Sequence, residues 1–238
     1  MCGRYSLFVS PDDLADRVGV RVEEYRPRYN AAPGQRLPVI TDAASDRLTR
    51  LEWGLIPGWA DPRSDGGHIN ARAETVAEKA SFRAAFERSG GELAAGRCLV
   101  PADGFYEWVA EEGGKQPYRV TLADERPFLM AGLWARWQPP TTQTGLDAFT
   151  GGRTDAQSEP IETFAIVTTE PNEFVADLHH RMAVILADED AETWLTADPE
   201  RARGLLGPYP AEEMAAYPVS TAVNDPANDS PGVVEPVE

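Results

Sequence analysis

The chain has 238 residues, 42% of them hydrophobic, and a formal net charge of −17. This length suits one large domain or one domain with extensions, and the apolar fraction is ordinary for a protein that buries a core. No apolar run approaches the roughly 20 residues that span a bilayer, two cysteines are too few for a disulfide framework, and no signal-peptide pattern opens the chain, so we expect a cytoplasmic protein without a membrane partner.

The periodicity of the sequence predicts many short strands and few helices. In chain order, the predicted elements are a helix over 11–26, strands near 36–41 and 48–56, a helix over 78–89, strands near 97–101, 104–109, 117–122, 127–134 and 163–169, a helix over 172–178, a strand near 182–187, and helices over 188–196, 199–205 and 211–215. Most connections are too short for repeated strand–helix–strand units. We therefore expect an α+β fold with a single mixed, largely antiparallel sheet, curled into a barrel-like form, with peripheral helices.

Composition divides the chain into one domain with two less ordered parts. Residues 1–223 form the predicted domain, and the Thr-, Gly- and Pro-rich stretch 139–162 is expected to be a flexible surface insert. Residues 224–238 have the composition of a polar C-terminal tail, for which disorder is the ordinary expectation.

The charge of the chain comes with very little lysine. Only Lys79 and Lys115 are lysines, so arginine supplies the other 20 of the 22 basic residues. An acidic surface of this kind suggests adaptation to concentrated salt, and the alternative is an acidic protein of ordinary salinity. The net charge disfavours sequence-blind coating of nucleic acid but leaves room for a local cationic groove.

The second residue, Cys2, gains unusual chemistry once Met1 is removed. Cysteine is small enough for methionine aminopeptidases to release Met1, which leaves Cys2 with a free α-amine. The pKa of an α-amine is roughly 8, against about 10.4 for lysine, so about a tenth of it is neutral near pH 7. That amine can attack an aldehyde to form a Schiff base, and the neighbouring thiol can close onto the imine carbon as a thiazolidine. The alternative is a small buried hydrophobe.

The stretch "INARAET" places three polar residues at alternating positions, Asn70, Arg72 and Glu74. In an extended chain all three would point to the same side. An amide, a guanidinium and a carboxylate on one face suggest a polar site, and the alternative is a solvated strand edge.

Two further residues are candidates for proton transfer. Glu107 lies between two aromatic residues in "GFYEW", which would desolvate its carboxylate and raise its pKa, unless the side chain faces water. His179 and His180 are adjacent and point in different directions, so they do not suit one metal, and the chain has no zinc-ligand spacing. One of these histidines could shuttle protons, or serve only a structural purpose.

Two tryptophans follow Gly- and Pro-rich turns. Trp53 and Trp59 flank the turn in "WGLIPGW" and could pack in a core or stack on unpaired bases. Residue type alone favours the core for Trp53 and leaves Trp59 open.

Six stretches in order resemble one family. MCGRY, RYNAAPGQ, WGLIPGW, INARAET, RCLVPADGFYEW and DLHHRM follow the order seen in the SRAP family, the SOS-response-associated peptidases or abasic-site processing proteins. The resemblance covers about residues 1–138 and 163–235, which is everything but the insert.

The resemblance implies a fold, a partner and a set of site residues. It implies a monomeric mixed α/β domain that binds single-stranded DNA containing abasic sites in a positively charged cleft, without cofactor or metal. Cys2 would crosslink to the opened sugar as a thiazolidine. The implied catalytic residues are Cys2, Asn70, Glu107 and His179, and the implied DNA contacts are Arg4, Arg72 and Arg181 to phosphates, Trp53 and Trp59 against the DNA, and Asn30 and Thr168 along the pocket.

The sequence departs from the family pattern at two positions, and two other functions stay open. Ala183 replaces the usual proline behind the histidine motif, and Ala60 stands where some relatives have a second aromatic residue. One alternative is a cysteine peptidase that removes its own Met1. The other is a non-catalytic single-strand binding module.

Overall fold

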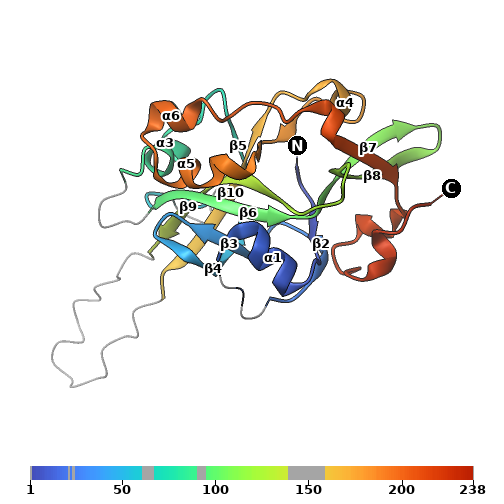
Figure 1. The fold of residues 1–238 in the computed structure, drawn as a ribbon, viewed down its shortest axis with the longest axis horizontal. Helices are drawn as coiled ribbons and strands as arrows, with labels where there is room; N and C mark the ends of the chain where they lie inside the picture. Colours follow the sequence, from blue (N-terminus) through green and yellow to red (C-terminus); the bar gives the residue numbers. More distant parts are fainter. Residues whose placement is uncertain are drawn as a thin grey trace, which may run out of the picture.

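The structure is a computed structural model that describes residues 2–20, 22, 25–60, 67–89, 95–138 and 159–237. Its strands form two sheets, and short helices lie around them (Figure 1). The strands are β1 (Tyr5–Leu7), β2 (Arg28–Ala31), β3 (Arg36–Thr41), β4 (Ala44–Trp53), β5 (Asn70–Arg72), β6 (Ala95–Ala102), β7 (Gly104–Glu111), β8 (Gly114–Leu122), β9 (Phe128–Trp137), β10 (Ile161–Thr169), β11 (Met182–Ala183), β12 (Ile185–Leu186) and β13 (Met214–Pro218). The α-helices are α1 (Pro11–Val18), α3 (Ala80–Phe86), α4 (Glu173–Ala176), α5 (Ala191–Thr196) and α6 (Pro199–Arg203), and the 3-10 helices are η2 (Asp188–Asp190), η3 (Ala211–Glu213), η4 (Thr221–Asn224) and η5 (Pro231–Val233). Across these described ranges, every helix is too short or too polar to cross a membrane.

The larger sheet contains a closed ring of strands, which runs from β10 through β4, β3, β6 and β9 back to β10. Only β4 and β10 are parallel within the ring. β5 and β11 extend it along β10, and β12 extends it along β9. The predicted α+β class and the barrel-like, largely antiparallel arrangement are confirmed, although the strands divide between two sheets.

Alternating side chains on the ring strands enter two different hydrophobic clusters. On β6, Cys98 and Val100 pack in a cluster with the aromatic residues of both sheets, whereas Leu99 packs with residues of α3 and α5. This alternation is the period-two pattern of a strand buried on both faces. Gly132 lies opposite Cys98 on β9, where a Cβ would come 2.7 Å from the Cys98 sulfur, so the ring closes tightly only with glycine there.

The smaller sheet carries the start of the chain. Its order is β13–β8–β7–β1–β2, and all its neighbouring strands are antiparallel. It packs on the ring through Tyr5 of β1, whose ring centroid lies 5.3 Å from that of Trp53. The N-terminal residues therefore run beside β7 and against the ring.

The first helix is shorter than predicted. The Ser10 side chain accepts a hydrogen bond from the Asp13 N–H, and Pro11 occupies the first helical position. Gly19 follows Val18 with φ of 67° and ends the helix. The predicted helix over 11–26 therefore stops at residue 18, and residues 21, 23 and 24 lie outside the described residues.

Parts of the predicted insert 139–162 and of the predicted helix 211–215 belong to strands. Residues 139–158 of the insert lie outside the described residues, whereas residues 161 and 162 belong to β10 and pair with β9. The predicted helix over 211–215 is wrong, because only Ala211–Glu213 is helical and Met214 begins β13, which pairs with β8.

The described part of the predicted polar tail, residues 224–237, packs against the rest of the protein. Val233 is buried in a small cluster with Tyr106, Val219 and Val223. Apolar contacts of this kind and main-chain bonds to the preceding strand, such as that from the Val237 N–H to the Pro218 carbonyl, hold these residues against the smaller sheet.

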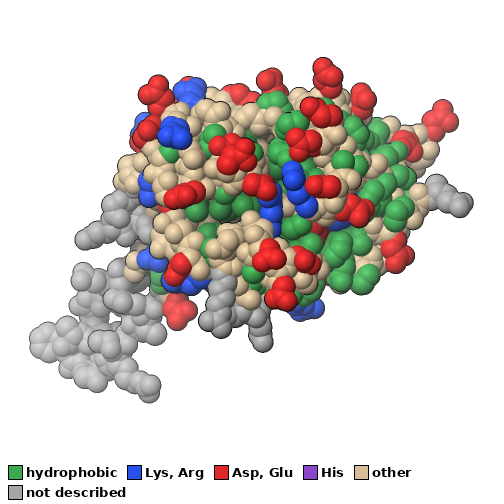
Figure 2. Space-filling model, viewed as in Figure 1, with side chains coloured by type: hydrophobic (Ala, Val, Ile, Leu, Met, Phe, Trp, Pro, Cys, Tyr) green, Lys and Arg blue, Asp and Glu red, His purple; other side chains and the backbone are tan. Residues whose placement is uncertain are grey.

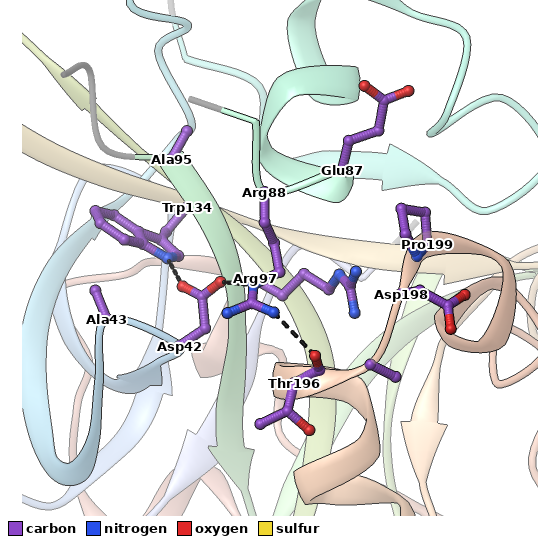
Figure 3. A pocket seen from close by; sticks show the side chains of 11 residues that line it. Asp42, Ala43, Glu87, Arg88, Ala95, Arg97, Trp134, Thr196, Asp198 and Pro199 are labelled. Atoms are coloured by element: carbon purple, nitrogen blue, oxygen red, sulfur yellow. Dashed lines mark hydrogen bonds and ion pairs between the residues drawn. The ribbon is translucent and has the colours of Figure 1, made fainter. Parts of the chain in front are cut away.

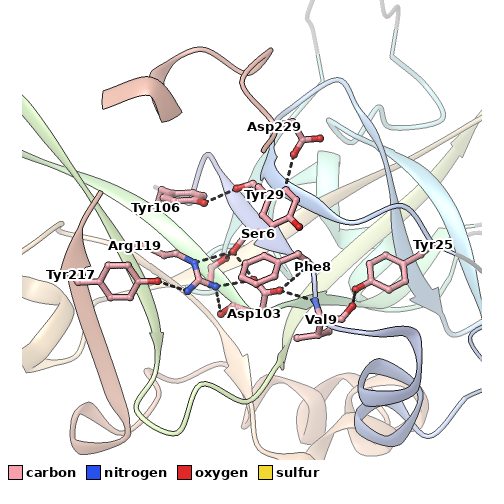
Figure 4. A network of polar contacts seen from close by, with 11 residues as sticks. Ser6, Phe8, Val9, Tyr25, Tyr29, Asp103, Tyr106, Arg119, Tyr217 and Asp229 are labelled. Carbon is pink, nitrogen blue, oxygen red and sulfur yellow. Dashed lines mark hydrogen bonds and ion pairs between the residues drawn. The ribbon is translucent and has the colours of Figure 1, made fainter. Parts of the chain in front are cut away.

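A buried carboxylate joins β1 to the turn between β6 and β7 (Figure 4). Asp103 accepts hydrogen bonds from the Ser6 hydroxyl at 2.6 Å, from the Phe8 N–H, and from Arg119 Nη2 at 2.9 Å. Arg119, on β8, also donates to the Tyr217 hydroxyl of β13 at 2.7 Å. One charged pair thus connects four strands of the smaller sheet.

We expect Asp103→Ala to lower the free energy of unfolding by about 3–5 kcal/mol, because Arg119 would be left as a buried charge without its partner. The exposed pair of Asp124 with Arg126, at 3.5 Å, provides the control. Asp124→Ala should cost less than about 1 kcal/mol. Urea denaturation measures both, and equal losses would show that burial of the Asp103 pair does not matter.

Candidate active site

Cys2 is buried at the start of the smaller sheet. Its side chain packs in the main hydrophobic cluster with no exposed surface, two residues before Arg4 leads into β1. The Asn70 side-chain amide donates a hydrogen bond to the Cys2 carbonyl at 3.0 Å. Burial, followed by the charge of Glu107, raises the pKa of the Cys2 thiol above its ordinary value. The thiol is therefore neutral near pH 7, and Glu107 lies close enough to affect it.

Asn70 is held in place by a parallel pairing. It begins β5 and lies opposite Ile166 of β10, while Arg72 lies opposite Thr168. The extended conformation assumed for "INARAET" is thus present at Asn70 and Arg72, whereas Glu74 lies in the turn that follows β5. The Asn70 side-chain oxygen is buried, and within the described part of the chain it has no hydrogen-bond partner.

Glu107 is a buried carboxyl group in the middle of β7. Its side chain is 3% exposed, and this burial raises its pKa to about 7. The predicted desolvation of Glu107 is confirmed, and the alternative of a carboxylate facing water is wrong. A carboxyl group with this pKa can both give and take a proton near neutral pH.

His179 faces Glu107 from the loop that follows α4. Its Nδ1 lies 3.9 Å from a Glu107 carboxylate oxygen, and its side chain is 21% exposed. The same Nδ1 lies 3.0 Å from the Arg181 main-chain nitrogen, from which it can accept, and 3.1 Å from the Arg181 carbonyl oxygen, to which it can donate, so Arg181 fixes the orientation of the ring in either tautomer. Burial lowers the pKa of His179, so the neutral ring predominates at pH 7.

The structure therefore brings the four predicted catalytic residues into one group. Cys2 contacts Asn70, Glu107 acts on Cys2 through its charge, and His179 faces Glu107. His179 is partly exposed where Cys2 and Glu107 are buried, and so it marks the side from which solvent reaches the group. In the described ranges, no three His, Cys, Asp or Glu side chains are placed to hold a metal ion.

The predicted phosphate contact Arg4 is fixed by the C-terminal part of the chain. Its Nη1 donates to the Asn30 side-chain oxygen at 2.7 Å and to the Val223 carbonyl at 2.8 Å, and its Nη2 to the Asn224 carbonyl at 3.2 Å. Asn30 is fully buried, and its amide nitrogen donates to three carbonyls of residues 223–228. Asn30 thus orients Arg4 from within the protein, and its predicted place along the pocket stays a prediction.

A second carboxylate secures the same region. Asp229 accepts hydrogen bonds from the main-chain N–H groups of Tyr29 and Asn30, at 2.7 and 3.1 Å, and from the Arg28 guanidinium at 2.8 Å. Residues 219–237, which we call the C-terminal segment, are therefore part of the site's support. Sequence analysis missed Asp229, because turn-forming residues such as those in "NDPANDS" are the same in a docked turn and in a disordered tail.

Arg181 and Arg72, the other two predicted phosphate contacts, lie in different surroundings. Arg181 forms a two-bond pair with Glu74, at 2.6 and 2.9 Å, and donates to the Thr168 carbonyl at 2.7 Å. Arg72 is exposed on the same strand as Asn70. The Thr168 side chain is buried and its carbonyl holds Arg181, while its predicted contact with DNA stays a prediction.

The two tryptophans lie in opposite surroundings. Trp53 is buried, packs between Tyr5 and Phe164, and donates its indole N–H to the Ile69 carbonyl at 2.9 Å. Trp53 is therefore a core residue of this structure, and its predicted contact with DNA stays a prediction. Trp59 is 67% exposed in the turn that follows β4, where a base could reach it.

Comparisons with known proteins agree on one family. The profile of the SOS response associated peptidase (SRAP) family matches residues 1–226. The chain is 41% identical to the abasic site processing protein YoqW of Bacillus subtilis, with 99% of both chains covered. It is 33% identical to the abasic site processing protein HMCES of Gallus gallus, covering 100% of this chain and 78% of that one. A crystal structure of a Bacteroides thetaiotaomicron protein, 29% identical, superposes over the whole of both chains with a TM-score of 0.80.

The raised pKa of Glu107 predicts how the free energy of unfolding depends on pH. The folded pKa of about 7 lies above the ordinary value, so the folded state holds this proton more tightly than the unfolded state. The contribution of Glu107 to the free energy of unfolding is fully present below about pH 4 and is lost as the pH rises through about 7. Glu107→Gln should remove this loss. Its free energy of unfolding, relative to that of wild type, should therefore rise by roughly 2–3 kcal/mol from pH 4.5 to pH 8.

Glu111→Gln is the matched control, because Glu111 is exposed at the end of the same strand. Chemical denaturation at several pH values measures the difference for each variant. A Glu107→Gln difference that does not change with pH would contradict the buried, weakly acidic carboxyl group.

Proposed function

Since the chain belongs to the SOS response associated peptidase (SRAP) family, we propose that it processes abasic sites in DNA and captures them covalently in single strands through Cys2. Relatives at 33–41% identity carry the name abasic site processing protein, which supports the lesion as substrate. The observation that carries the proposal is the grouping of Cys2, Asn70, Glu107 and His179 at the start of the smaller sheet.

The chemistry begins when Met1 is removed and Cys2 presents its α-amine. The neutral amine adds to the C1′ aldehyde of the opened deoxyribose to give a carbinolamine, and loss of one water gives a protonated imine. The Cys2 sulfur then adds to C1′, and its proton passes to a base. The sum is aldehyde plus amino thiol giving thiazolidine plus one water.

Glu107 is suited to the proton transfers of these steps. With a pKa of about 7 it can donate a proton to the leaving hydroxyl and accept the proton that the thiol releases. The raised pKa of the thiol makes such a base useful, because the thiol does not ionise by itself near neutral pH. The same carboxyl group would serve the reverse path when the adduct opens.

Asn70 and His179 would place the reactants. The Asn70 amide nitrogen already holds the Cys2 carbonyl, and its buried oxygen can accept a hydrogen bond from the liberated amine. The neutral His179 ring, partly exposed beside Glu107, can act at the sugar hydroxyl during ring opening. Holding amine and aldehyde in register accounts for a large part of such rate gains.

Arginines would bind the DNA backbone beside the lesion. Arg4, Arg72 and Arg181 can contact phosphates without reading base sequence, as a lesion sensor requires. Trp59 offers an exposed ring for stacking. Acidic side chains are scattered over the face seen in Figure 2, and the net charge is −17, so we expect phosphate contacts to depend on these few arginines.

A peptidase that releases its own Met1 is the second candidate, which the family name favours. A cysteine peptidase attacks with a thiolate, whereas burial and the charge of Glu107 raise the pKa of the Cys2 thiol. The amine route forms its first bond without a thiolate, and for that reason we place it first.

Covalent capture is tested with Met1-processed protein and a single-stranded oligonucleotide that contains one abasic site. We expect a retarded band on a denaturing gel with wild type and only background with Cys2→Ala or with Met1 retained. Cys98→Ala, the same change at the other buried cysteine, should keep the band. Borohydride should trap the imine of wild type, which an acyl-enzyme would not allow. An undiminished band with Cys2→Ala would refute the proposal.

The support of Arg4 by the C-terminal segment can be tested by measuring how binding to single-stranded DNA depends on salt concentration. Asp229→Ala removes the acceptor for the Tyr29 and Asn30 N–H groups, so Arg4 should lose its fixed position. We expect the reversible affinity for undamaged single strands to fall, and the slope of log K against log salt to shrink by about 0.7, which is one phosphate contact.

Glu235→Ala is the control for the loss of one negative charge, because Glu235 is exposed in the same segment. It should leave the slope unchanged. A slope that Asp229→Ala does not alter, in a variant with wild-type circular dichroism, would show that the segment does not act on Arg4.

A further inference from the structure

A cavity of about 470 Å³ lies between α3, β6 and the turn that joins α5 to α6 (Figure 3). Its walls include Arg88 at the end of α3, Arg97 on β6, Trp134 on β9 and Asp42 after β3. None of the four residues of the candidate active site lines it.

Arg97 is a fully buried cation with one unused donor. Its Nε donates to the Phe86 carbonyl at 2.9 Å and its Nη1 to the Trp194 carbonyl at 2.7 Å. The guanidinium lies over the rings of both residues, 5.5 and 5.4 Å from their centroids. Its Nη2 is buried and has no hydrogen-bond partner among the residues that the structure describes. A buried donor without an acceptor is costly, so this nitrogen calls for an acceptor from outside the chain.

Arg88 brings a second guanidinium to the same cavity at some conformational cost. Its φ is 57°, a region that residues with side chains rarely adopt. This conformation lets Arg88 donate through Nε to Asp42 at 2.8 Å and through Nη1 to the Thr196 carbonyl at 2.9 Å. Backbone strain of this kind is concentrated at binding sites.

The geometry around Asp42 is equally constrained. Asp42 also accepts the Trp134 indole N–H at 2.8 Å, and a Cβ on Gly96 would come 2.3 Å from an Asp42 oxygen. Glycine at position 96 therefore lets Asp42 sit between Arg88 and Trp134. With both of its oxygens engaged, this carboxylate orients Arg88, and it favours the Arg97 cation through its charge without accepting a hydrogen bond from Arg97 Nη2.

The remaining acidic groups at the cavity accept no hydrogen bond from Arg97 Nη2, although the charge of Asp198 favours the Arg97 cation. Asp198 accepts the Arg201 N–H at 3.0 Å and so caps its own helix, α6. The Glu87 carboxylate points away from Arg97 (Figure 3). The side of the cavity formed by Arg88 and Arg97 is therefore cationic, although the protein as a whole is strongly acidic.

We propose that this cavity binds a small oxyanion, a phosphate or phosphate monoester, between Arg97 Nη2 and Arg88. Guanidinium groups are well matched to phosphate oxygens, and the cavity is large enough for a phosphate that carries a small organic group. The site is separate from the abasic-site chemistry and does not depend on it.

The test is a titration of the full chain with inorganic phosphate at constant ionic strength, with KCl as the balancing salt. The readout is the Trp134 indole N–H resonance, because this group contacts Asp42 beside Arg88. We expect a saturable shift of Trp134 while the Trp108 indole, bonded to Asn224, stays unmoved. The melting temperature should rise by about 2 °C or more at saturation.

Arg88→Gln should raise the half-saturating phosphate concentration at least tenfold, and this partly exposed residue can be changed without opening the core. Arg126→Gln, an equal change of charge in a surface ion pair, should bind phosphate as wild type does. Equal effects of both variants, or equal movement of Trp134 and Trp108, would overturn the site.

A nucleoside monophosphate and an undamaged single strand separate the possible sources of the phosphate group. Saturation by the monophosphate, with no shift from the single strand at the same phosphate concentration, supports a free ligand. A larger shift of Trp134 with the single strand than with phosphate would overturn the proposal in favour of a DNA-backbone contact.

Discussion

The buried carboxylate of Asp103 fixes the position of β1, and the candidate active site depends on that position because Cys2 lies just before β1. By accepting hydrogen bonds from Ser6 and Phe8 as well as from Arg119, it holds β1 between β2 and β7. A chain terminus is ordinarily the least ordered part of a protein. Here the second residue is instead buried and held at a fixed place beside Glu107. An N-terminal reagent needs this fixation, because its reactive atoms have no preceding chain to position them.

Burial then sets the protonation of the whole group. Burial keeps the Cys2 thiol neutral, raises the pKa of Glu107 to about 7, and lowers the pKa of His179. A carboxyl group that exchanges protons near neutral pH beside a neutral thiol suits a reaction that passes through an amine, an imine and a sulfur adduct. The same burial weakens the case for a thiolate nucleophile. Under the proposed function the acidic composition adds a further constraint, because the arginines proposed to contact DNA are themselves fixed by main-chain carbonyls and by Glu74.

Local patterns predicted the parts of this structure that depend on local forces. Apolar runs located β3 and β6 to β10, and a proline after Ser10 marked the start of α1. The aromatic neighbours of Glu107 correctly predicted its desolvation. What failed depended on long-range contacts. Residues 214–218 form a strand where β8 offers an edge, and the C-terminal segment is held by residues far away in the sequence, among them Asn30, Arg4 and Tyr106. Motif matching placed Trp53, Asn30 and Thr168 at the DNA, whereas all three are buried supports of the residues beside them. A motif marks a neighbourhood, and only the fold shows which of its side chains are open.

The central claim is that one residue supplies both atoms that bind the lesion, the amine nitrogen and the sulfur of Cys2. The most direct measurement is mass spectrometry of the adduct after digestion of DNA and protein. Cleavage after Arg4 should release a peptide of residues 2–4 whose mass equals that peptide plus the sugar fragment minus one water. A sugar attached to a peptide that still contains Met1, or to any other residue, would contradict the account.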